Sequence, residues 1–82
     1  MSKRTAKKRI SAAIAYAIDH VMVLDITDEQ LESRVNTLFN VYEDAMSRIN
    51  ASATVKGRSA VKKHFASLFE DVKQAVGNAI KA

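Results

Sequence analysis

Residues 10–24, ISAAIAYAIDHVMVL, decide the fold of this chain, because their apolar positions repeat with the period of an α-helix. The positions that recur at steps of four and three form one stripe, made by Ile10, Ile14, Ala17, Val21 and Leu24. Several alanines in the same stretch allow neighbouring helices to approach closely. We therefore expect a helix over residues 5–23, capped by Thr5 or, if it begins earlier, by Ser2, that packs against other helices along this stripe.

A basic head, KRTAKKR, occupies residues 3–9 and runs directly into this helix. Its cations would stand in the first turns of a helix, where the macrodipole favours anions by about 0.3–1 kcal/mol per charge. Helix stability therefore does not explain them. Residues 1–9 are either a frayed arm or a surface that meets something negative, and we expect residues 10–82 to form a single three-helix domain.

Two further amphipathic segments follow in the chain. Residues 27–30, TDEQ, have the pattern of a capping box and predict a second helix over residues 28–52. Gly57 marks the next turn, and Ser59 can cap a third helix over residues 59–81. The sequence thus predicts an all-α fold, an antiparallel up-down-up three-helix bundle. Its predicted core consists of Ile14, Val21, Leu38, Tyr42, Phe65, Leu68 and Val72.

Composition and motifs argue against catalysis. The 82 residues include no cysteine, which excludes disulfides, thiolate chemistry and the usual structural zinc frameworks. The chain has no nucleophile paired with a base, no glycine-rich cofactor loop and no Glu-x-x-His motif. Asp19 and His20 are neighbours in a helix and so do not face each other. We expect no catalytic residue, no metal site and no cofactor, and therefore no enzyme.

The apolar run of the first helix does not predict a membrane span. Asp19 and His20 interrupt it well before the roughly 20 residues that a bilayer requires. Residues 15–17, AYA, resemble a signal-peptide cleavage site, but cleavage there would leave too short an apolar region after the basic head. We expect a small soluble protein in the cytoplasm.

The predicted topology brings most of the cations to one end of the bundle, although the net charge is only +4. The start of the first helix, the end of the second and the start of the third meet there, together with ten of the thirteen Lys and Arg residues. Such a field attracts polyanions. We expect DNA or RNA phosphates to be bound, without strong sequence specificity, by Lys3, Arg4, Lys7, Lys8, Arg9, Lys56, Arg58, Lys62 and Lys63.

An alternative hypothesis is a protein–protein interaction or assembly module, such as a phage or bacterial accessory factor, an inhibitor or a structural component. The apolar helix faces are wide, and three helices alone do not obviously cover them. The partner-binding residues would then be Phe39, Met46, Phe69 and Val76. The short chain also leaves a homodimer open.

Overall fold

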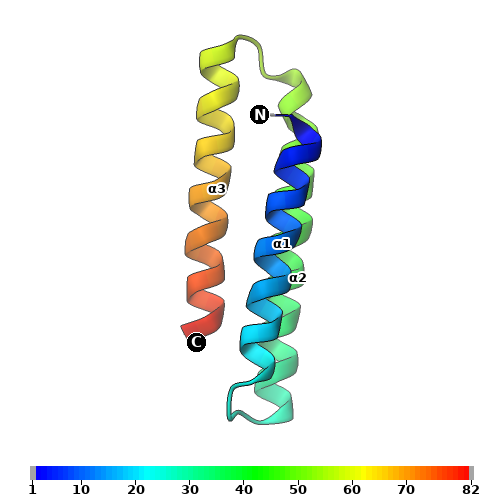
Figure 1. The fold of residues 1–82 in the computed structure, drawn as a ribbon, viewed down its shortest axis with the longest axis vertical. Helices are drawn as coiled ribbons and strands as arrows, with labels where there is room; N and C mark the ends of the chain where they lie inside the picture. Colours follow the sequence, from blue (N-terminus) through cyan, green and yellow to red (C-terminus); the bar gives the residue numbers. More distant parts are fainter. Residues whose placement is uncertain (1, 82) are drawn as a thin grey trace.

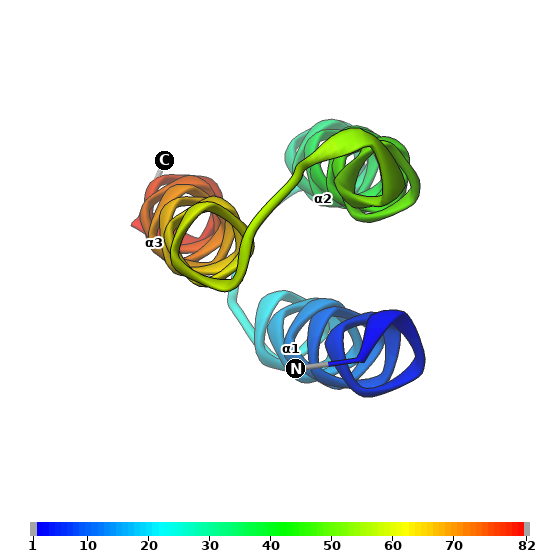
Figure 2. The same ribbon diagram turned by 90° about the horizontal axis from the view of Figure 1, so that it is seen from above.

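The computed structural model describes residues 2–81, which form three long helices joined by short connections. The helices are α1 (Lys3–Met22), α2 (Asp28–Ala51) and α3 (Arg58–Lys81), and a short 3-10 turn, η1 (Ser52–Thr54), follows α2. Consecutive helices run in opposite directions along a rod of 47 × 18 × 15 Å (Figure 1). Seen along the rod, the three helices occupy the corners of a triangle (Figure 2). The predicted all-α, up-down-up three-helix bundle is confirmed.

The first helix begins at the earlier of its two expected caps, Ser2 rather than Thr5. Ser2 is its N-cap, and the Ser2 hydroxyl accepts a hydrogen bond from the backbone N–H of Thr5 at 3.2 Å. The helix then runs through the basic head, where Ala6 is completely buried. Residues 3–9 are thus the first turns of α1, while Met1 lies outside the described residues.

The second helix begins where its capping box predicted. The Thr27 hydroxyl accepts from the Gln30 backbone N–H, and the Gln30 side chain accepts from the Thr27 N–H, both at 3.2 Å. Asp28 and Glu29 occupy the first turn, where the macrodipole favours negative charge. Local chemistry therefore fixes this boundary before any packing is considered.

The core runs along the axis of the bundle and draws on all three helices. Six of the seven predicted core residues are buried, whereas Tyr42 is half-buried and packs against the core from its edge. A tyrosine keeps its hydroxyl hydrated unless a protein partner replaces the water, and this explains the position at the edge. The buried set is Ala6, Ile10, Ile14, Ala17, Val21, Leu38, Ala45, Ile49, Phe65, Leu68, Val72 and Ala79.

The connection after α2 satisfies backbone carbonyls that a helix end leaves without partners. The Ser52 hydroxyl donates to the Ile49 carbonyl at 2.6 Å, and the Thr54 hydroxyl donates to the Ala51 carbonyl at 2.7 Å. Gly57 then adopts a positive φ of 92°, which favours glycine. The third helix begins directly afterwards at Arg58, so Ser59 lies inside the first turn and does not occupy the cap position predicted for it.

Helices α2 and α3 also cap each other. From α3, His64 bonds through Nε2 to the Arg48 carbonyl near the end of α2 at 2.9 Å. From α2, Arg34 donates through its guanidinium to the Ile80 carbonyl near the end of α3 at 3.0 Å. Because the two helices are antiparallel, these contacts lie near opposite ends of the rod and fix the register between the helices.

Candidate functional site

The structure brings the predicted phosphate-binding residues to one end of the rod. The first turns of α1 lie beside the connection between α2 and α3 (Figure 1). This placement follows from the antiparallel order of the helices, which returns the chain to the same end at residue 58. All nine predicted residues are exposed except Lys7, which is half-buried. We call the surface formed by these nine residues the basic end.

The segments of the three helices that lead to the basic end contain no acidic residue. Residues 3–18 and 45–69 include ten Lys and Arg residues and neither Asp nor Glu. The other three cations and all nine acidic residues leave the rest of the chain with a formal charge of −6. A modest net charge therefore conceals a strong separation of charge along the rod, and the electrostatic field at the basic end is strongly positive.

One of the ten cations in these segments, Arg48, forms an ion pair. Arg48 contacts the Asp71 carboxylate at 2.9 Å, with 30% and 55% of the two side chains exposed. A pair this exposed contributes little to stability. Within residues 2–81 it is the one ion pair shorter than 4 Å, so the nine cations of the basic end have no carboxylate neutralising them there.

Two helix N-termini add to this field. Both α1 and α3 begin at the basic end, and a helix N-terminus carries a partial positive charge. The backbone amides of Arg58, Ser59 and Ala60 have no partner inside α3, because the first amides of a helix precede its first hydrogen bond. The opposing C-terminus of α2 is capped by His64, Ser52 and Thr54, as described above.

An apolar groove of about 880 Å³ opens in the same half of the molecule. It follows α3 from Gly57 to Phe69, and its apolar lining consists of Val61, Phe65, Ala66 and Phe69. The rings of Phe65 and Phe69 lie nearly parallel, with their centroids 6.4 Å apart. The sequence predicted the apolar residues here but not that they line a groove.

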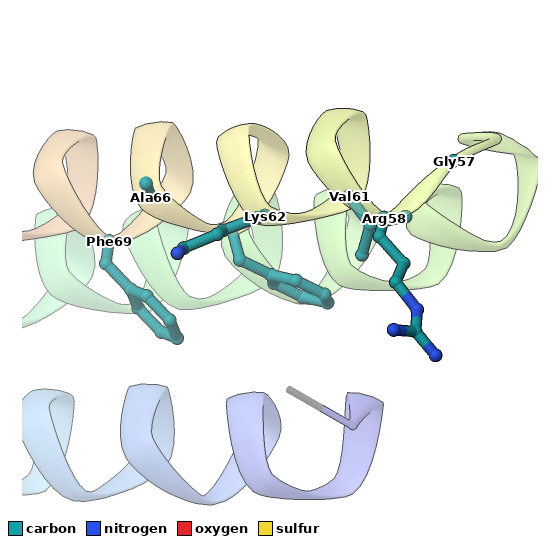
Figure 3. Close-up of a pocket in the computed structure, with 7 residues that line it drawn as sticks. Gly57, Arg58, Val61, Lys62, Ala66 and Phe69 are labelled. Atoms are coloured by element: carbon teal, nitrogen blue, oxygen red, sulfur yellow. The ribbon is translucent and has the colours of Figure 1, made fainter.

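The groove has a cationic rim. Arg58 and Lys62 line it, and no acidic residue does. Figure 3 shows Arg58 and Phe69 directed from α3 toward the space beside the first turns of α1. The basic end thus combines exposed cations with an apolar surface, and this combination suits a ligand that carries both anionic and apolar groups.

The four residues of the alternative partner surface have different environments. Phe39 on α2 is 50% exposed, whereas Met46, Phe69 and Val76 are half-buried and pack against the core. Of the four, only Phe69 lines the groove. The structure therefore places part of this alternative surface next to the basic end and part of it on the side of α2.

Among residues 2–81, no three His, Asp or Glu side chains lie together in an arrangement that could hold a metal ion. Nor is any helix within that range both long enough and apolar enough to cross a bilayer. Comparison of the chain with protein families, curated proteins and solved structures finds no match.

Proposed function

We propose that this protein is a non-enzymatic binding protein whose basic end engages the phosphates of DNA or RNA. The observation that carries the proposal is the separation of charge, with ten cations and no carboxylate in residues 3–18 and 45–69. The cations at the start of α1 oppose the helix macrodipole, so they do not stabilise the helix that bears them. A negative partner gives them a role that the fold does not.

The chemistry of the basic end favours contacts to the nucleic-acid backbone over contacts to bases. Lysine ammonium groups and arginine guanidinium groups bind phosphate oxygens without reading sequence. The groove offers no neutral hydrogen-bonding side chain that could recognise a base edge, because its lining is apolar apart from Arg58 and Lys62. We therefore propose binding with weak sequence preference. We place it in the cytoplasm, a reducing compartment with which a chain without cysteine is compatible.

Matched pairs of substitutions test the proposal. Lys8→Gln/Lys62→Gln removes two exposed cations of the basic end, and Lys73→Gln/Lys81→Gln removes two exposed lysines that lie outside it. Binding to a fluorescent mixed-sequence duplex and to a single strand is followed by anisotropy at low salt. Because the first variant loses two exposed ionic contacts, its affinity for nucleic acid should fall by roughly two- to thirtyfold. The affinity of the second variant should not change comparably.

A competition experiment distinguishes nucleic acid from other polyanions as the ligand of the basic end. Heparin and an acidic polypeptide of similar charge are added to the duplex complex as competitors. Equal binding of both lysine variants to the duplex, or no binding by the intact protein at low salt, would contradict the proposal. In that case the basic end is a solvated surface.

A further inference from the structure

The end of the rod opposite the basic end carries an exposed apolar projection. Met22 and Val23, at the end of α1, are 63% and 82% exposed. Acidic residues flank them closely in sequence, with Asp19 one turn earlier and Asp25 and Asp28 just after. All three of these carboxylates are exposed. We call the surface formed by Asp19, Met22, Val23, Asp25 and Asp28 the acidic tip.

The shape of the acidic tip is held by the turn between α1 and α2. The backbone N–H of Leu24 donates to the Val21 carbonyl, and the N–H of Ile26 donates to the Leu24 carbonyl, each at 3.1 Å. Leu24 is half-buried, and Ile26 packs against the core. Because these two side chains anchor the turn, Met22 and Val23 remain on the outside. A preformed surface loses little conformational entropy when it binds.

The groove beside α3 is the counterpart of the acidic tip in both polarity and charge. Its lining is apolar, with Val61, Phe65 and Phe69, and its rim is cationic, with Arg58 and Lys62. We propose that the acidic tip of one copy docks into this groove of a second copy. Met22 and Val23 then cover the exposed part of the groove lining, chiefly Phe69, and the carboxylates of the tip meet the cations of the rim.

The arrangement of the two surfaces determines the kind of assembly. They lie in opposite halves of a rod 47 Å long, so a chain cannot fill its own groove with its own tip. A single tip–groove contact is heterologous and extends into chains, whereas two rods lying antiparallel can make the contact twice, each tip in the other's groove, and close a two-fold dimer. We therefore expect copies to associate through tip–groove contacts, either as antiparallel dimers or as head-to-tail chains.

Charge favours the tip–groove contact over contacts between two grooves or between two tips. Groove against groove would bring two cationic halves together, and tip against tip would bring two sets of carboxylates together, so both are opposed by like-charge repulsion. A tip–groove contact instead pairs the cationic groove rim of one copy with the acidic tip of the other. The inference does not depend on nucleic-acid binding, although both would use Arg58 and Lys62.

Complementation between two variants tests the proposal. The groove variant is Arg58→Glu/Lys62→Glu, and the tip variant is Met22→Gln/Val23→Gln/Asp25→Asn; all five side chains are exposed, so both variants should fold. Sedimentation equilibrium is measured without nucleic acid, in low salt, from about 10 μM to about 1 mM, because a contact smaller than the standard ~1,600 Å² is weak. Circular dichroism checks that each variant is helical.

The expected results form a distinctive pattern. The average mass of the intact protein rises with concentration to that of a dimer or beyond, while each variant alone stays monomeric. Their mixture forms a one-to-one dimer and nothing larger, because it contains one working tip facing one working groove. The charge-matched control Lys73→Glu/Lys81→Glu changes exposed lysines outside the groove and should associate like the intact protein.

Three outcomes would overturn the proposal. The intact protein could remain monomeric throughout, which would leave the groove to an acidic helix of another protein. One of the two variants could still associate on its own, which would indicate a groove–groove or a tip–tip contact. The two variants could also fail to complement each other although the intact protein associates, which would place the contact elsewhere. Since nucleic acid is absent, none of these outcomes bears on phosphate binding.

Discussion

The His64 imidazole joins the helix it belongs to, α3, to the end of α2 by donating from Nε2 to the Arg48 carbonyl at 2.9 Å. The carbonyl can only accept, so the proton lies on Nε2. His64 is half-buried and also meets the Phe65 ring edge to face, with centroids 5.7 Å apart. This single side chain therefore ties the start of α3, where the groove and several cations lie, to the rest of the bundle.

Replacing His64 tests the contribution of this contact to stability. His64→Phe keeps an aromatic ring but removes the donor, and the unpaired, partly buried carbonyl should lower the free energy of unfolding by about 1 kcal/mol or more. His64→Gln retains a donor and should recover part of the loss. Urea unfolding followed by circular dichroism measures both, with His20→Phe, at an exposed position, as the control. A midpoint for His64→Phe equal to that of the intact protein would show that the contact does not stabilise the fold.

The two glycines should respond to alanine in opposite directions. Gly57 has a φ of 92°, and no atom lies within 4 Å of where a Cβ would stand, so Gly57→Ala is opposed by backbone strain alone, at about 1–2 kcal/mol. Gly77 lies inside α3 with equally open space, and Gly77→Ala should stabilise the protein by about 0.5–1 kcal/mol. Urea midpoints that shift the same way for both variants would contradict the assigned backbone conformations.

Truncation of the core should threaten the fold of so short a chain. Leu68 is completely buried, and Leu68→Ala should cost about 2–5 kcal/mol, a large fraction of the roughly 5–15 kcal/mol that typical domains have. Tyr16→Ala, at a side chain that is 72% exposed, should cost far less. The two variants are compared by urea unfolding, and similar losses for both would place Leu68 outside the core.

The sequence predicts the fold well because the determinants of each helix are local. The stripe from Ile10 to Val21 and the capping box at Thr27 predict the ends of the first two helices to within two residues. The Ser2 cap accounts for the two extra residues at the start of α1. The third boundary is one residue off, because Gly57 ends the turn and the helix starts immediately after it. Neighbouring residues are sufficient for these predictions.

The features that sequence analysis missed are all contacts between distant residues. The bond from His64 to Arg48 spans 16 residues, and that from Arg34 to Ile80 spans 46. The periodic pattern places His64 near the face of α3 but does not say which carbonyl it meets. The grouping of the cations was predictable, because it requires only the order and direction of the helices.

The most direct test of the central claim, that the basic end binds nucleic-acid phosphates, is the salt dependence of binding to a mixed-sequence duplex. The logarithm of the binding constant should fall linearly with the logarithm of salt concentration, with a slope of roughly 0.9 per phosphate neutralised. For Lys8→Gln/Lys62→Gln the slope should be smaller by about 1.8, while Lys73→Gln/Lys81→Gln should keep the slope of the intact protein. Equal slopes for all three proteins, or no binding at about 50 mM salt, would contradict the claim.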